Sequence, residues 1–200
     1  MKKTTSTVLL EDLRTDTRQI ILQVNYLLQQ DPDVLLQQPA AGKWSIVQII
    51  EHLNSYGRYY LPLMKGSLSS PANPPTEFFI PGWLGEYFVK SMLPKSNGQV
   101  TNKMQSPKNH RPLPDIDSKT TLEEFLQQEF LLLQLLENAG KTNLGKIRIP
   151  ISISRFIKIK LGDTFRFLIA HHQRHFVQVQ NTMKVVGALK APGTFLLNAV

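Results

Sequence analysis

One apolar stretch, between Phe165 and Met183, contains three histidines within five consecutive positions: His171, His172 and His175. The stretch has the periodicity of an amphipathic helix, in which residues four apart lie one turn above each other. His171 and His175 can therefore direct ring nitrogens at one point between them, as two ligands of one metal ion do. The spacing predicts a site for a divalent metal.

A third histidine, His52, belongs to a second amphipathic stretch. It flanks the apolar stripe of that stretch at the same offset at which His171 and His175 flank theirs. Two helices packed along these stripes would bring the three imidazoles together, two from one helix and one from the other. The alternative for His52 is a histidine of the surface or a hydrogen-bonded histidine of the core.

Two further histidines are weaker candidates. His172 lies in the middle of its apolar stripe, and we interpret it as a buried packing residue. It stands three residues before His175, so it is also able to share a metal and to take the place of His171 as the ligand. His110 stands beside Arg111 in a proline-rich segment and is predicted to be an exposed loop side chain.

The sequence excludes several other chemistries. It has no cysteine, so disulfides, thiolate ligands and a cysteine nucleophile are absent, and a metal must be held by His, Asp or Glu. The stretch around His171 lacks the His-Glu-x-x-His pattern of metalloproteases, and no glycine-rich phosphate loop or Gly-x-Ser-x-Gly elbow is present. No carboxylate stands at helical spacing from the histidines to act as a general base.

The net charge of +8 comes from 23 Lys and Arg against 15 Asp and Glu. Several cations stand in a segment that is free of acids: Lys141, Lys146, Arg148, Arg155, Lys158 and Lys160. Such a segment can attract nucleic acid or an anionic surface, so a non-catalytic binding protein that uses residues 141–160 is an alternative function. Isoleucines rather than stacking aromatic residues alternate with these charges, which argues against nucleic-acid recognition.

The predicted architecture is an all-α bundle of four long helices in a single domain, residues 1–200. The helices are expected at residues 7–30, 46–64, 120–140 and 164–186. Ser45 and Gln48 predict a capping box at the start of the second helix. Thr120 and Glu123 predict another at the third helix, and Asp163 is the expected N-cap of the fourth.

Two segments differ from the long helices. Most of the 13 prolines stand in residues 62–114, which predicts a long crossover with one short helix at residues 82–93. Such a crossover lets the third helix run in the same direction as the second. In residues 147–161, isoleucines alternate with polar residues and predict a half-buried strand, which Pro150 confines to an edge or divides. The tail beyond residue 187 is expected to pack loosely.

The N-terminal ten residues contain only a short apolar run before Glu11. The run is too short for the core of a signal peptide or for a membrane span, so we expect a cytoplasmic protein.

Residues 43–53, Lys-Trp-Ser-Ile-Val-Gln-Ile-Ile-Glu-His-Leu, resemble the Trp-Ser-x-x-x-x-x-x-His-Leu helix of the DinB-like family of metal-binding proteins. Residues 161–163, Leu-Gly-Asp, lead to His171 and His175 and resemble the His-x-x-x-His helix of the same family. The resemblance extends from about Leu9 to Val186, most of the chain.

The resemblance implies a four-helix bundle in up-down-down-up order and a homodimer. It also implies a nickel or zinc ion on His52, His171 and His175. Relatives in this family include thiol-dependent transferases that use bacillithiol or mycothiol, and a maleylpyruvate isomerase, while many members have no known activity.

The predicted function is a thiol-dependent S-transferase that acts on a small-molecule substrate. Three histidines leave part of a zinc or nickel coordination shell open, where the ion lowers the pKa of a bound water or thiol. Because the chain has no cysteine, the thiol has to arrive as a low-molecular-weight cofactor such as bacillithiol. A metal-dependent hydrolase is the alternative. The metal is expected to leave as the imidazoles protonate below roughly pH 6.

Overall fold

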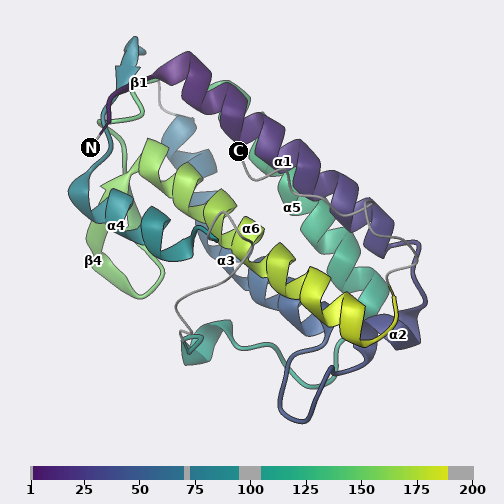
Figure 1. Cartoon of the computed structure of the whole chain (residues 1–200). Coiled ribbons are helices and arrows are strands. Elements are labelled where there is room, and N and C mark those ends of the chain that lie inside the picture. Colours follow the sequence, from purple (N-terminus) through teal and green to yellow (C-terminus); the bar gives the residue numbers. More distant parts are fainter. Residues whose placement is uncertain (1, 70–72, 95–104, 189–200) are drawn as a thin grey trace.

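The computed structural model describes residues 2–69, 73–94 and 105–188 (Figure 1). Four long helices form the bundle: α1 (Ser6–Leu27), α3 (Ile46–Leu68), α5 (Ser118–Ala139) and α6 (Leu161–Val185). α1 and α6 run in one direction, and α3 and α5 run in the opposite one (Figure 1). The predicted all-α bundle in up-down-down-up order is therefore confirmed.

Each long helix buries one apolar face in a shared core, as the periodicity of its sequence predicts. The core includes residues from all four helices that are fully buried: Ile20, Val24, Leu53, Phe125 and Phe176. Burial of a large apolar side chain contributes about 1.5–3 kcal/mol to the free energy of unfolding. This packing places α3 against α6, the two helices that carry the predicted metal ligands.

The start of α3 is the capping box predicted from the sequence. The backbone N–H of Gln48 donates to Ser45 Oγ over 3.2 Å, and the backbone N–H of Ser45 donates to Gln48 Oε1 over 3.0 Å. The box sets the first residue of the helix and with it the phase of every later side chain. His52 lies less than two turns beyond this start.

The start of α5 differs from the prediction. The helix begins at Ser118, and its N-cap is Asp117, whose carboxylate accepts a hydrogen bond from the backbone N–H of Thr120 over 2.7 Å. The capping box predicted at Thr120 and Glu123 is wrong because Asp117 already satisfies the first turn. Thr120 consequently lies inside that turn.

The start of α6 also differs. The helix begins at Leu161, so Asp163 lies within the first turn and is not the N-cap. Its carboxylate is fully buried, and it accepts hydrogen bonds from the backbone N–H of Gly82 over 2.8 Å and from Arg166 Nη1 over 3.2 Å. The prediction failed because this carboxylate joins two segments distant in sequence.

The ends of the first two long helices shift by a few residues. α1 ends at Leu27, and Asp31 caps a separate short helix, α2 (Pro32–Leu36), where the sequence predicted only a helix end. α3 continues past Pro62 to Leu68, four residues beyond its predicted end.

The crossover between α3 and α5 contains the predicted short helix, observed as α4 (Trp83–Met92). β2 (Phe78–Phe79) pairs antiparallel with β1 (Thr4–Thr5), and the 3-10 turn η1 (Lys108–His110) precedes α5. The expectation for the tail concerns mainly residues 189–200, which lie outside the described residues.

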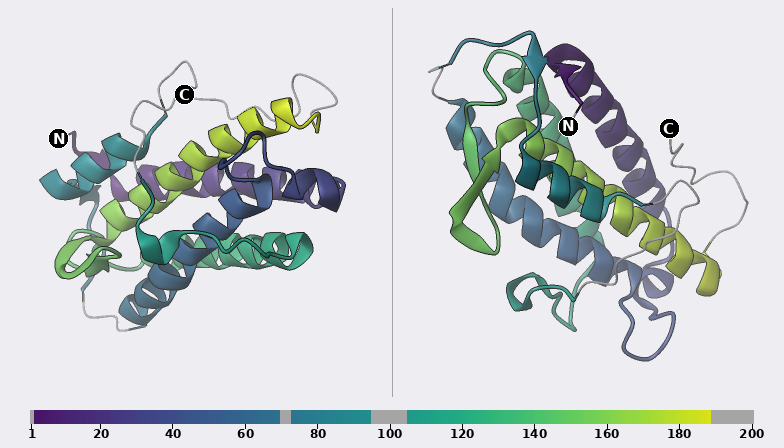
Figure 2. Two further views of the ribbon diagram at one scale, coloured as in Figure 1. Left: turned by 90° about the horizontal axis from the view of Figure 1, so that it is seen from below. Right: turned by 60° about the vertical axis from the view of Figure 1, so that its left-hand side comes forward.

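The isoleucine-rich segment forms an antiparallel hairpin of β3 (Arg148–Ile151) and β4 (Ser154–Lys160). A β element was predicted there, and Pro150 is paired with Lys158 next to a register irregularity. The hairpin and α4 both contact the first half of α6 at one end of the bundle (Figure 2). No helix among the described residues is long and apolar enough to cross a bilayer.

Candidate metal centre

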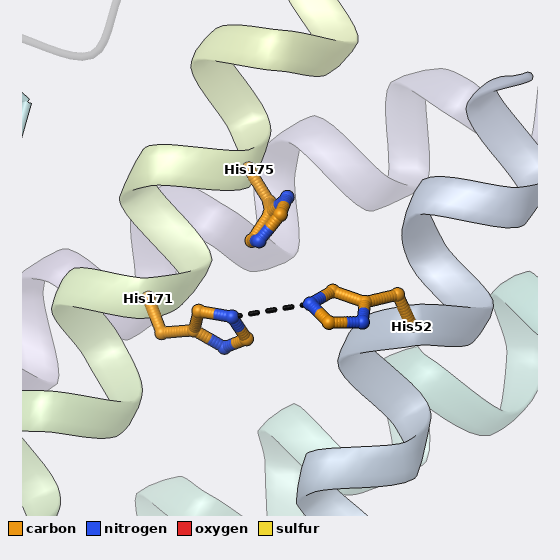
Figure 3. A group of neighbouring side chains, drawn as sticks. All are labelled: His52, His171 and His175. Carbon is orange, nitrogen blue, oxygen red and sulfur yellow. Dashed lines mark hydrogen bonds between the residues drawn. The ribbon is translucent and has the colours of Figure 1, made fainter. Parts of the chain in front are cut away.

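Three histidine side chains from α3 and α6 point at one another in the interior of the bundle (Figure 3). Each of His52, His171 and His175 offers one ring nitrogen, and these nitrogens all lie within 4.8 Å of one another. His52 and His171 are buried, and His175 is partly exposed. The structure thus brings together the three residues that the sequence analysis selected.

The spacing of the nitrogens suits a metal ion. His52 Nε2 lies 3.3 Å from His171 Nε2, the contact dashed in Figure 3. Two nitrogens that each lie about 2.0–2.1 Å from a tetrahedral zinc ion are about 3.3–3.4 Å apart. The first two candidate ligands already stand at that separation.

The orientation of His52 is set by a backbone carbonyl. His52 Nδ1 lies 2.7 Å from the carbonyl oxygen of His110. Because a carbonyl only accepts, Nδ1 carries the proton and Nε2 keeps its lone pair toward the other two histidines. A ligating histidine in proteins is usually held in this way by a group on its other nitrogen.

His175 is oriented by a neighbour on its own helix. Its Nδ1 lies 3.0 Å from Gln178 Oε1, three residues along α6. The amide oxygen accepts, so this imidazole too carries its proton on Nδ1 and leaves Nε2 available. His171 Nδ1 is buried and has no hydrogen-bond partner among the described residues.

The protonation of the three side chains also suits a metal. Burial lowers the pKa of His52 from its ordinary 6.5 to about 4. Burial, reinforced by the neighbouring histidines, lowers the pKa of His171 and His175 well below 6.5. The three imidazoles are therefore neutral at pH 7, which is the form that binds a metal ion.

A comparison of the sequence with known families agrees with this geometry. The family described as the DinB superfamily matches residues 9–179, most of the chain. The chain belongs to the DinB superfamily. No solved structure matches it.

His110 does not lie where the sequence predicted. In this DinB superfamily chain its side chain is buried, although it stands in the crossover. Its ring stacks on Tyr56 with the centroids 4.0 Å apart, and its Nδ1 lies 2.9 Å from Ser55 Oγ. The Ser55 hydroxyl donates to the carbonyl of His52, so it accepts from His110. The exposed-loop prediction is wrong because the crossover packs back onto α3.

His172 is a buried packing residue, as predicted, and does not belong to the group of three. Its ring lies 5.2 Å from that of Phe125, and its Nδ1 lies 3.0 Å from Glu129 Oε1 on α5. Among the described residues, the group that could hold a metal contains His171 and not His172.

Glu129 is a buried polar residue that was not predicted from the sequence. This carboxylate is almost fully buried, and it replaces an apolar residue in the stripe of α5 that Leu122, Phe125, Leu132 and Leu136 form. An acidic residue at a core position of a helix is rarely buried unless it is paired. That position was the signal that could have identified it.

The three histidines face a cavity of about 570 Å³ in this DinB superfamily chain. Trp44, Tyr56, Arg174 and Gln178 are among the other residues that line it. Its described lining contains no carboxylate. The cavity has the size of a typical small-molecule site, and its positive side chains and neutral imidazoles suit a ligand that brings negative charge.

Proposed function

We propose that this protein uses a divalent nickel or zinc ion, held by His52, His171 and His175, in a thiol-dependent S-transfer reaction. The observation that carries the metal site is the convergence of three neutral imidazoles at a cavity. Two of them are held by hydrogen bonds with Nε2 facing the group. A zinc or nickel ion supplies a Lewis acid that lowers the pKa of a thiol or water reaching it.

Two features favour a thiol over water as the nucleophile. The chain has no cysteine, so a thiol has to enter as a small cofactor such as bacillithiol. The described lining of the cavity also has no carboxylate to accept a proton from a water molecule, which a hydrolase of this type requires. Arg174 stands between His171 and His175 in the sequence and lines the cavity. Its positive charge favours a cofactor that carries negative charge.

The proposal includes a homodimer and a single domain that spans residues 1–200. Support for the dimer comes from the hairpin, where three apolar side chains are exposed: Ile153, Phe156 and Ile157. Phe156 is 98% exposed, and an apolar edge of this kind is a natural contact between two copies. A monomeric mass at micromolar concentration would contradict the dimer.

The metal site is tested by elemental analysis of protein purified without a polyhistidine tag. The wild type should hold about one nickel or zinc ion per chain, and His175→Ala should lose it because one of the three ligands is gone. His172→Gln is the matched control, since this neighbour lies outside the group, and it should keep the metal. Full metal content in His175→Ala would show that the assigned ligands are wrong.

The reaction is tested with metal-loaded protein, a haloaromatic electrophile and a series of thiols that includes bacillithiol and glutathione. We expect a rate that depends on both the thiol and the metal. If no thiol changes the rate while esters or amides are cleaved in a metal-dependent way, the protein is a hydrolase and the transferase proposal is wrong.

A further inference from the structure

A second cavity, of about 220 Å³, adjoins the cavity of the three histidines. The two share four lining residues: Tyr56, Met92, Gln105 and Pro107. The second cavity, here called the apolar chamber, is lined by residues of α3, α4, α6, the β3–β4 hairpin and the crossover segment before η1. The crossover and the hairpin, which are additions to the four long helices, therefore build a compartment directly beside the candidate metal centre.

The walls of the apolar chamber are aromatic. Tyr60 comes from α3, Phe88 from α4 and Phe167 from α6. The ring centroids of Tyr60 and Phe167 are 5.9 Å apart, and those of Phe88 and Phe167 are 6.1 Å apart. No charged side chain is among the described residues that line the chamber.

Two polar groups of the chamber wall are hydrogen-bonded to each other. The Tyr60 hydroxyl accepts a hydrogen bond from the backbone N–H of Ser152 over 3.0 Å, which fastens the turn of the hairpin to α3. A charged group that entered this chamber would lose its hydration without gaining a partner of opposite charge.

Tyr56 marks the boundary between the chamber and the metal centre. Its ring centroid lies 4.4 Å from that of His171 and 5.1 Å from that of His52. A group that fills the chamber and touches Tyr56 is consequently separated from the histidines by no more than the width of one ring.

We propose that the apolar chamber binds an uncharged, ring-sized apolar part of the substrate, while the reacting group of that substrate faces the three histidines. An apolar cavity of about 150 Å³ can bind benzene, so a chamber of about 220 Å³ accommodates one aromatic ring or a branched alkyl group of similar size. The inference rests on the proposed function only in placing the reacting group at the metal.

The test is a titration of the metal-free protein with toluene, followed by NMR of its methyl groups. Two substitutions on α4 form a matched pair: Phe88→Ala opens the chamber wall, and Trp83→Ala truncates an aromatic residue that is 75% exposed and lies outside the chamber. Ser91→Phe fills the chamber from the same helix. Binding should weaken about tenfold in Ser91→Phe and several-fold in Phe88→Ala, and it should stay unchanged in Trp83→Ala.

The outcomes separate this inference from the proposed function. Equal toluene affinity in wild type, Phe88→Ala and Ser91→Phe would overturn the chamber, as would an equal loss in Trp83→Ala. If Ser91→Phe does not fold, the comparison of Phe88→Ala with Trp83→Ala decides alone. Because neither metal nor thiol is present in this titration, a failure of the transferase assay does not affect its result. Absent toluene binding would overturn the chamber, but it would not contradict the proposed metal site.

Discussion

Lowering the pH should destabilise the metal-free protein through the three histidines of the candidate metal centre. Above pH 6.5, His52 is neutral in both the folded and the unfolded chain. Between pH 6.5 and about 4, the unfolded chain binds a proton on His52 that the folded chain does not, because burial lowers the folded pKa to about 4. The unfolded state then holds more protons, so stability is lost as the pH falls through this window.

The size of the effect follows from the two pKa values of His52. With 6.5 for the unfolded chain and about 4 for the folded chain, the free energy of unfolding falls by about 2 kcal/mol between pH 7 and pH 5. His171 and His175 act in the same direction, since their pKa values are also lowered by burial. A domain of this size is stable by roughly 5–15 kcal/mol, so the loss from His52 alone is a substantial fraction of the total.

The assay is urea unfolding of metal-free protein at pH 7 and pH 5, with His52→Gln as the partner variant. The variant removes one titrating group, so its stability should fall by about 2 kcal/mol less than that of the wild type over the same pH interval. This double difference cancels the carboxylates, which titrate equally in both proteins. An identical pH dependence in wild type and His52→Gln would refute the neutral, buried state of the imidazole.

The same shift would change the pH at which a metal bound by these histidines is lost. The expected loss below roughly pH 6 assumed imidazoles with ordinary pKa values. In the folded protein, protons compete for His52 only near pH 4. Metal should therefore remain bound at pH 5.5, and its release in acid should coincide with unfolding rather than precede it.

Two further predictions concern contacts outside the three histidines. Glu129→Ala should lower the free energy of unfolding by about 3 kcal/mol because it removes a buried partner of His172. Glu129→Gln keeps an oxygen acceptor at this position and should cost less. Equal losses of stability in urea unfolding of the two variants would contradict the pairing. Gly85→Ala should cost about 1–3 kcal/mol, since its new methyl group would overlap the buried Asp163 carboxyl. Gly66→Ala is the control, since Gly66 lies in a helix with no atom near the new methyl group, and it should be neutral or stabilising by up to about 1 kcal/mol. Similar thermal stability of the two glycine variants would contradict the overlap with Asp163 as the cause.

The three histidines could be predicted from the sequence because their placement depends mainly on helix periodicity. His171 and His175 are one turn apart on α6, whatever the rest of the chain does. The capping box at Ser45 sets the phase of α3, so the face that carries His52 follows from a local signal. Only the distance between α3 and α6 could not be predicted in this way, because it depends on how the core packs.

The residues that the sequence analysis misjudged depend on contacts between distant segments. The proline-rich surroundings of His110 predict an exposed residue, but it is buried by contacts with Ser55 and Tyr56, more than fifty residues earlier. Glu129 is paired with His172 on another helix. Asp163 fits the local pattern of an N-cap, yet its carboxylate accepts a hydrogen bond from the backbone N–H of Gly82 instead. Local patterns carry no information about such partners.

The crossover links the metal centre to the apolar chamber. The carbonyl of His110 fixes the His52 tautomer, and Pro107, three residues earlier, lines both cavities. A change that loosens this segment from α3 would free the His52 ring to turn and would open the chamber at once. Metal affinity and the binding of apolar ligands should therefore respond together to substitutions at Ser55, whose hydroxyl contacts the His110 ring, although Ser55 does not belong to the group of three. In the proposed site, the crossover would then be the element that couples the three histidines to the apolar chamber, because it contacts both.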